Sequence, residues 1–163
     1  MESINALHVL SQALRLETEG LAFYMQAAAE TVDPKGKELF LSLADDERQH
    51  QEMIRRQLHA LEGNGEYVLL PDLAVTPIDL DKPLFPPSTE EVVKRTGDNP
   101  TEQDALFVAM ENEIKSYDLY RAEALKTSGP AQQMYQWLAG AELTHFNLLM
   151  SNWEALNANG TWV

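Results

Sequence analysis

Apolar residues in two stretches of the chain recur at spacings of three, four and seven, the period of a helix that faces a core. The two stripes are Phe40, Leu43, Glu47, His50, Ile54 and Leu61, and Tyr135, Leu138, Glu142, His145, Leu149 and Leu156. Each stripe therefore carries one Glu-x-x-His motif among its apolar positions. A buried carboxylate without a partner strongly destabilises a helix. The pattern predicts a metal ion, because Glu-x-x-His offers an oxygen and a nitrogen from adjacent turns of one face.

Both motifs belong to a longer internal repeat. Four positions recur at offsets of 95 or 96 residues: Glu17 and Glu113, Tyr24 and Tyr120, Glu47 and Glu142, and His50 and His145. Chance hardly supplies four such matches. The chain is therefore interpreted as two copies of a helix pair, each contributing Glu, Tyr and Glu-x-x-His.

The periodic stretches and their flanking turn residues predict an all-α protein with four long helices. The helices are expected at about residues 3–31, 36–62, 100–126 and 130–157, with Ser3 and Asn99 as N-caps. Asp33-Pro-Lys-Gly36 and Ser128-Gly-Pro130 are expected as tight turns, so the helices in each pair should be antiparallel. Gly63-Asn64-Gly65 is expected to end the second helix.

The stretch between the two helix pairs is rich in proline, and residues 63–100 hold six of the eight prolines. Residues 63–99 are therefore interpreted as a long crossover within a single domain of residues 1–163, with room for one short helix after Ser88-Thr-Glu-Glu91. Two antiparallel hairpins whose inner helices run parallel need such a connection. The predicted fold is a four-helix bundle.

The composition of the chain limits the classes of partner and of chemical site that it can have. The formal charge of −14 argues against nucleic acid or an anionic membrane as a partner. No apolar run approaches the length of a membrane span, and Met1-Glu2-Ser3 lacks the basic start of a signal peptide. The chain has no cysteine, which excludes thiolate metal sites and thiol nucleophiles and leads us to expect a cytoplasmic protein.

Six side chains are candidate metal ligands: Glu17, Glu47, His50, Glu113, Glu142 and His145. Their four carboxylates would neutralise two divalent cations, and without cations they would repel one another. Carboxylate and imidazole ligands suit iron or manganese, and the absence of thiolates argues against a structural zinc site.

At these residues the chain resembles the ferritin-like di-iron superfamily, and most closely its rubrerythrin-related branch. The resemblance covers the four helices, with local agreements at residues 17–24, 44–50, 113–120 and 142–145. It implies a ferritin-like bundle that holds two iron ions, with manganese or zinc as alternatives.

The resemblance also implies a role for each candidate residue. Glu17 and Glu113 would each bind one ion, whereas Glu47 and Glu142 would bridge the two. His50 would bind on the Glu17 side and His145 on the Glu113 side. Tyr24 and Tyr120 would orient the ligand carboxylates across the pair; the alternative for both tyrosines is a core aromatic with a satisfied hydroxyl.

Three departures from the family pattern limit what the resemblance implies. Rubrerythrins proper add a Cys-ligated rubredoxin domain, and this chain has no cysteine. They also carry a further Glu one turn after the third-helix ligand, where this chain has Ser116. Bacterioferritins bind haem through a Met after the first bridging Glu, and Arg48 stands there, so no haem is expected.

The function that the resemblance implies is a peroxide-reducing oxidoreductase with an external electron donor, acting as a homo-oligomer, a dimer being expected. One alternative is a ferritin-like oxidase that handles ferrous iron with oxygen or peroxide, which needs a shell-forming oligomer. The other is a helical module whose metals are purely structural. The sequence alone leaves these three functions open.

Several other residues have expected roles outside the ligand set. His8 and His59 are expected at the surface or in packing rather than as ligands. Glu19 and Glu111 are expected at the surface, because each lies about 200° around its helix from a ligand position. Trp137 and Trp153 are expected to pack or to form an interface. Asp46 is a candidate to accept a hydrogen bond from a ligand His on a neighbouring helix.

Overall fold

The computed structural model describes residues 2–70, 73 and 100–163. Four helices make up most of these residues: α1 (Glu2–Glu30), α2 (Pro34–Asn64), α4 (Pro100–Lys126) and α5 (Gly129–Asn159). The short helix expected after Ser88 and the cap expected at Asn99 lie outside the described residues.

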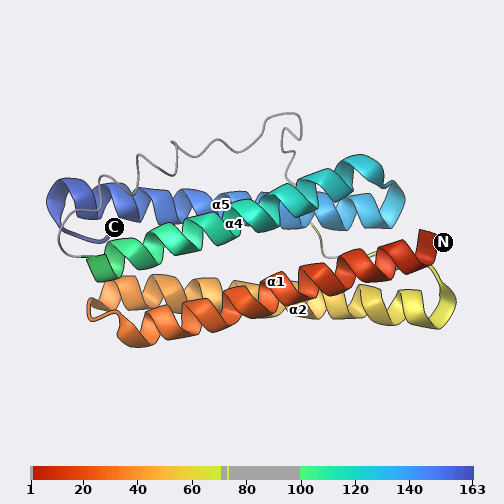
Figure 1. Cartoon of the computed structure of the whole chain (residues 1–163), viewed down its shortest axis with the longest axis horizontal. Helices are drawn as coiled ribbons and strands as arrows, with labels where there is room; N and C mark the ends of the chain where they lie inside the picture. The colour runs from red at the N-terminus through yellow and green to blue at the C-terminus, as the bar shows by residue number, and fades with distance from the viewer. Residues whose placement is uncertain (1, 71–72, 74–99) are drawn as a thin grey trace.

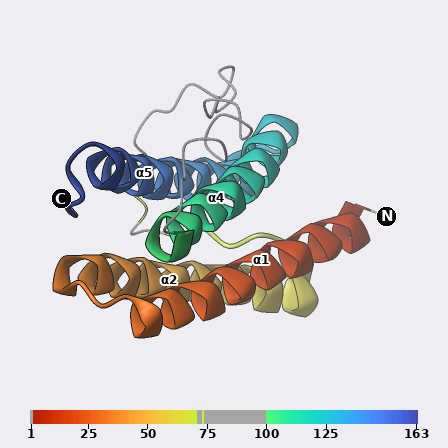
Figure 2. The same ribbon diagram turned by 60° about the vertical axis from the view of Figure 1, so that its left-hand side comes forward.

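The helices form two antiparallel hairpins, α1 with α2 and α4 with α5 (Figure 1). Helices α2 and α4 run in the same direction (Figure 1). The two hairpins lie on each other as two layers (Figure 2). The predicted all-α, ferritin-like four-helix bundle is therefore confirmed.

The ends of α2 differ from the predicted ones for a local reason. Asp33 is the N-cap, and its side chain accepts a hydrogen bond of 2.8 Å from the backbone N–H of Lys35, so the helix begins already at Pro34. At the other end the left-handed residue is Gly65, with φ of 76°, and its N–H donates to the carbonyl of Leu61. Gly63 consequently lies inside the helix.

The start of α1 corrects one prediction. Ser3 was expected as its N-cap, but the helix already includes Glu2, so Ser3 lies within the first turn. Helix α5 begins after Ser128, whose side chain makes no capping hydrogen bond, and it ends at Gly160 in the left-handed conformation.

Two apolar clusters fill the bundle, one towards each end. The first contains Leu10, Ala13, Ile54, Leu61, Tyr120, Tyr135 and Leu138 among its members. The second contains Tyr24, Phe40, Leu43, Leu106, Met110, Phe146, Leu149, Trp153 and Trp162 among its members. The buried polar residues of the predicted site lie along the same helices between these two groups, so the apolar clusters exclude water from both sides.

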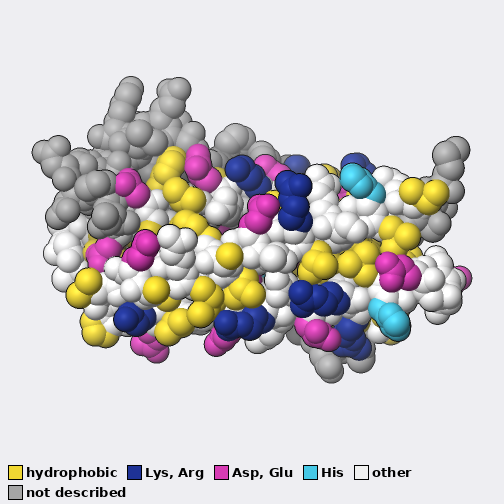
Figure 3. Space-filling view, turned by 60° about the horizontal axis from the view of Figure 1, so that its bottom comes forward, with side chains coloured by type: hydrophobic (Ala, Val, Ile, Leu, Met, Phe, Trp, Pro, Cys, Tyr) yellow, Lys and Arg dark blue, Asp and Glu magenta, His cyan; other side chains and the backbone are white. Residues whose placement is uncertain are grey.

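The outer surface mixes charge with apolar side chains. On the face turned to the viewer in Figure 3, basic and acidic side chains lie among apolar ones along the length of the bundle. No helix among the described residues is both long and apolar enough to cross a membrane.

Candidate metal site

All four helices contribute to a buried group of six polar side chains. Glu17 comes from α1, Glu47 and His50 from α2, Glu113 from α4, and Glu142 and His145 from α5. Each of the six is at most 3% exposed. The structure thus brings together every residue that the sequence marked as a candidate ligand.

The six side chains form two overlapping groups. One contains Glu17, Glu47, His50 and Glu142, and the other contains Glu47, Glu113, Glu142 and His145. In each group, one potential ligand atom per residue lies within 4.8 Å of those of the others. Glu47 and Glu142 belong to both groups, which is the placement that a bridging carboxylate requires.

The two imidazoles divide between these groups. His50 Nδ1 lies 3.2 Å from a carboxylate oxygen of Glu17, and His145 Nδ1 lies 3.4 Å from one of Glu113. The two rings are nearly parallel, with centroids 5.5 Å apart. Each imidazole therefore points a nitrogen into the centre from its own side of the group.

Several buried atoms of the group have no hydrogen-bond partner among the described residues. They are Glu113 Oε2, Glu142 Oε1 and His145 Nδ1. His50 Nδ1 approaches Glu142 Oε1 to 3.1 Å, but not in hydrogen-bonding geometry. Buried polar atoms without partners are costly and rare in folded proteins. A cation would satisfy these atoms, so the donor set fits a metal ion.

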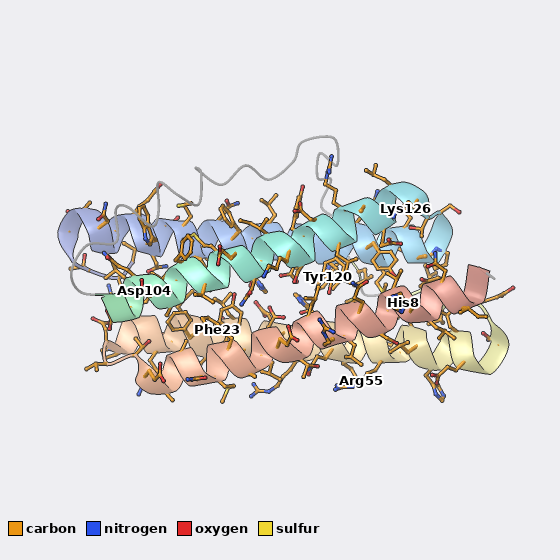
Figure 4. The ribbon with its side chains drawn as sticks, in the orientation of Figure 1. His8, Phe23, Arg55, Asp104, Tyr120 and Lys126 are labelled. Carbon is orange, nitrogen blue, oxygen red and sulfur yellow. The ribbon has the colours of Figure 1, made fainter. Side chains whose placement is uncertain are left out.

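Two tyrosines link the hairpins through the candidate ligands. Tyr24 on α1 donates a hydrogen bond to Glu113 on α4, and Tyr120 on α4 donates one to Glu17 on α1. Figure 4 shows the side chain of Tyr120 between α4 and α1. Burial and then the charge of the nearby carboxylates raise the pKa of both tyrosines well above 10.0. Both hydroxyls therefore remain protonated donors.

His145 has a carboxylate partner behind it, and that partner is Asp46. His145 Nε2 lies 3.1 Å from Asp46 Oδ2, on the side of the ring away from the site. This hydrogen bond, with burial opposing it, lowers the pKa of Asp46. A charged Asp46 fixes the proton on Nε2 and leaves Nδ1 free to bind a cation. This is the role expected for Asp46 from the sequence, that of accepting a hydrogen bond from a ligand histidine on a neighbouring helix.

The carboxyl groups of the site differ in proton affinity. Burial raises the pKa of Glu17, but hydrogen bonds with Glu47 and His50 outweigh it and lower the pKa to about 2. Burial and the neighbouring carboxylates raise the pKa of Glu47 and of Glu142 well above 4.5. Two of the four carboxylates therefore take up protons readily when no cation is bound.

His145 adds a positive charge to the metal-free site. Burial alone would lower its pKa, but the hydrogen bond to Asp46 and the nearby carboxylates of Glu113 and Glu47 raise it to about 12. Protons on His145 and on the two carboxylates common to both groups thus relieve much of the repulsion expected in an empty site.

Sequence reasoning did not identify a small cavity of about 10 Å³ beside the carboxylates, lined by Gly20, Ser116, Glu47, Glu113 and Glu142 among others. This volume is about the room of a single water molecule. A methyl group at Gly20 would lie 3.3 Å from Glu47 Oε2. The only sequence signal is a glycine inside a helix, three residues after Glu17, where an isolated glycine suggests close packing.

The remaining marked residues lie mostly where they were expected. His8, His59 and Glu19 are exposed, whereas Glu111 is half-buried. Trp153 is buried in the second apolar cluster. Trp137 packs its ring edge-on against His50, with centroids 5.5 Å apart.

Comparison with known families gave one result. A family model described as Rubrerythrin matches residues 8–152, a span that includes all six candidate ligands and both tyrosines. Comparisons with curated proteins and with solved structures gave no significant match.

Proposed function

Because the chain belongs to the rubrerythrin family, we propose that it is a non-haem di-iron protein that reduces hydrogen peroxide with electrons from an external donor. The observation that carries the proposal is the pair of buried clusters that share Glu47 and Glu142. This arrangement suits two cations close together, with Glu17 and His50 on one and with Glu113 and His145 on the other.

Two bound ferrous ions would supply two electrons, the number that converts one peroxide molecule into two waters. Around them, the four carboxylates neutralise the charge of two divalent cations. Tyr24 and Tyr120 hold Glu113 and Glu17 in place by hydrogen bonds from the opposite hairpin. Burial of the site keeps water and bulky reductants away from the oxidant.

The size of the free space supports a very small substrate. The cavity beside Glu47, Glu113 and Glu142 has a volume of about 10 Å³. Space on this scale has room for about one water molecule, so it admits no bulky substrate. Gly20 and Ser116 keep this space open, because larger side chains at these positions would fill it.

An electron donor outside these helices is part of the proposal. The 163 residues contain no cysteine, so they hold no thiolate-bound iron that could deliver electrons. Turnover therefore stops after one event per site unless a reductase or a small electron carrier reduces the metals again.

The direct test is to mix anaerobic diferrous protein with stoichiometric peroxide or with oxygen in a stopped-flow instrument. The near-ultraviolet absorption of the diferric pair should rise much faster with peroxide, and the reaction should stall until reductant is added. Glu19→Ala, on the exposed side of α1, is the matched control and should react like the wild type.

Two outcomes would replace this proposal with another function. Oxygen that reacts as fast as peroxide, together with a large hollow oligomer in solution, would favour a ferritin-like iron oxidase. If neither oxidant changes the spectrum of the fully loaded protein, the metals are structural.

A homodimer is the assembly that we propose. Large apolar side chains are exposed near the turn between α1 and α2, with Met25 at 40%, Val32 at 87% and Leu41 at 42%. Burying such side chains against a second copy would remove apolar surface from water. Sedimentation should give twice the mass of one chain, and a monomer at all concentrations would contradict the proposal.

A further inference from the structure

A chain of three tyrosine rings leads from the candidate metal site to the surface. Tyr120 donates a hydrogen bond to Glu17, and its ring stacks on that of Tyr135 with centroids 6.2 Å apart. The ring of Tyr135 meets that of Tyr67 at 6.5 Å, and their hydroxyl oxygens lie 3.4 Å apart. Tyr120 and Tyr135 are fully buried, whereas Tyr67 is half-buried.

Tyr67 lines a surface pocket of about 440 Å³ at the end of the bundle. The pocket lies between the start of α1, the end of α2 and the turn from α4 to α5, and Leu61, Glu66 and Pro130 are also among its lining residues. The three rings therefore connect a buried carboxylate with a place that small molecules can reach.

A buried glutamine holds the segment that carries Tyr67. Gln57 is fully buried, and its side chain makes two hydrogen bonds with the backbone of Val68, of 2.7 Å and 2.9 Å. Val68 lies after the end of α2, outside the helical hydrogen-bond pattern. The side chain of Gln57 therefore satisfies the backbone N–H and C=O groups of Val68. These two hydrogen bonds fix Tyr67 beside Tyr135.

The other half of the repeat has the same packing with a different ring in the middle. Tyr24 stacks on Phe40 with centroids 6.2 Å apart, and Phe40 meets Trp162 at 5.8 Å. Phe40 and Tyr135 are 95 residues apart, the offset of the two Glu-x-x-His motifs. A phenyl ring has no hydroxyl proton to release and is far harder to oxidise than a phenol. We call each series of three rings an arm. The arm from Tyr24 is interrupted at Phe40, whereas the arm through Tyr135 is complete.

We propose that Tyr120, Tyr135 and Tyr67 form a relay that carries an oxidising equivalent from the metal site to the pocket, where a small one-electron reductant removes it. The proposal rests on the proposed function, because peroxide at the site is the oxidant. The relay acts when one of the two irons would be ferrous and the other already ferric, so that the metals could supply only one of the two electrons.

Peroxide takes up two electrons and two solvent protons when it becomes two waters. Where bound metal would supply only one of these electrons, Tyr120 would supply the other. The hydroxyl proton of Tyr120 moves to Glu17, its hydrogen-bond acceptor, and a neutral tyrosyl radical remains at Tyr120.

The radical then moves outward in two further steps. Tyr135 gives an electron to Tyr120 through the stacked rings, while Glu17 returns the proton to Tyr120. The proton of Tyr135 passes to the oxygen of Tyr67, whose own proton leaves to the pocket. Tyr67 next transfers a hydrogen atom to Tyr135, and a one-electron reductant with one solvent proton restores Tyr67.

Burial supports this order of proton and electron movement. It raises the pKa of Tyr135 and of Tyr67 above 10.0, so both hydroxyls are protonated before oxidation. Each tyrosine must therefore lose its proton together with an electron, and the contact between the two hydroxyls provides the path.

The test starts from protein in which half of the electrons have been removed by titration, so that each site holds one ferrous and one ferric ion. Peroxide is added, samples are frozen, and electron paramagnetic resonance follows the mixed-valent and the radical signals. In the wild type, the mixed-valent signal should disappear and a tyrosyl radical should appear that ascorbate removes quickly.

Two variants interrupt the relay while keeping its rings. The radical should remain at Tyr120 in both variants, because Tyr135→Phe removes the electron donor to Tyr120 and Tyr67→Phe removes the oxygen that accepts the proton of Tyr135. Removal by ascorbate should slow by an order of magnitude in both. Trp162→Phe changes the outer ring of the interrupted arm and serves as the matched control. Ascorbate should remove its radical as fast as in the wild type.

A second readout locates the radical. A bulky nitroso spin trap should label the wild-type protein at Tyr67, detected by peptide mass spectrometry, and the label should fall by an order of magnitude in Tyr135→Phe. Wild-type protein without a tyrosyl radical, or Tyr135→Phe protein with wild-type removal and labelling, would overturn the relay and leave the proposed function intact. A mixed-valent signal that survives peroxide in the wild type would contradict the proposed function and the relay with it.

Discussion

His50 and His145 occupy equivalent positions of the repeat but have different neighbours. Asp46, directly before Glu47, reaches His145, and their closest atoms are 3.1 Å apart. The equivalent residue before Glu142 is Ala141, which has no carboxylate to offer to His50. A hydrogen bond from a ligand imidazole to a carboxylate fixes the tautomer and strengthens the ligand. The two metal positions are therefore expected to differ in affinity.

Asp46→Asn tests this difference. The variant should weaken one of two ferrous binding steps by about 10- to 100-fold and leave the other nearly unchanged. Anaerobic calorimetric titration resolves the two steps. Asp45→Asn is the control, because Asp45 is exposed and pairs with Arg48 on the same helix. Equal weakening of both steps would show that Asp46 supports the fold of the site rather than one ligand.

The pKa shifts predict that metal-free protein loses stability as the pH rises. The pKa of His145 is about 12 in the folded protein, against 6.5 for an ordinary histidine. Its contribution to the free energy of unfolding is therefore complete below pH 6.5 and is lost towards pH 12. The raised pKa values of Glu47 and Glu142 act in the same direction, because their contribution is present below 4.5 and is lost above. Glu17, with a folded pKa of about 2, contributes above 4.5 and loses this contribution towards pH 2.

Metal binding should reverse this trend, since ligands bind a cation only after they lose their protons. We expect the rise in midpoint temperature on adding manganese or ferrous ions to grow from neutral to alkaline pH. Scanning calorimetry with and without chelator measures it. A rise that stays constant or shrinks with pH would show that the cation does not displace these protons.

At the scale of the elements, the C-terminal residues pack on the turn between α1 and α2. Trp162 is buried there, and its indole N–H donates a hydrogen bond of 3.2 Å to Glu102 at the start of α4. Gly36 makes this approach possible, because a Cβ there would lie 2.6 Å from the Trp162 ring and 2.7 Å from Thr31. The tail therefore ties the end of one hairpin to the other.

Gly36→Ala should destabilise the protein by about 1–3 kcal/mol, because it forces the ring of Trp162 away. Gly63→Ala is the matched variant. It also lies in α2, but nothing lies within 4 Å of its added Cβ, so it should stabilise the helix by about 0.5–1 kcal/mol. Urea unfolding measures both free energies. Equal effects of the two substitutions would contradict the packing of the tail.

Helix positions were predictable because apolar spacing and turn residues act locally. The second helix was expected at 36–62 and is observed at Pro34–Asn64, and the difference comes from a cap at Asp33 and a stop at Gly65 rather than Gly63. Each of these residues could have taken more than one role in a turn. The choice between them depends on backbone conformation, which the sequence pattern does not specify.

At the scale of the whole molecule, the repeat explains why the six candidate ligands could be recognised. Spacing placed each pair on one face, and the fold then brought the four faces together around Glu47 and Glu142. The cavity at Gly20 and the contact of Tyr135 with Tyr67 were not recognised. They depend on contacts between helices and on a segment after α2, and no periodic pattern encodes such contacts.

The most direct test of the central claim is the metal content of protein purified from iron-supplemented cells. The wild type should hold two metal ions per chain by elemental analysis, and so should the Glu19→Ala control. Glu47→Ala and Glu142→Ala should lose most of the metal, because each side chain belongs to both clusters. Wild-type protein without stoichiometric iron, manganese or zinc would contradict the claim that these clusters form a dimetal site.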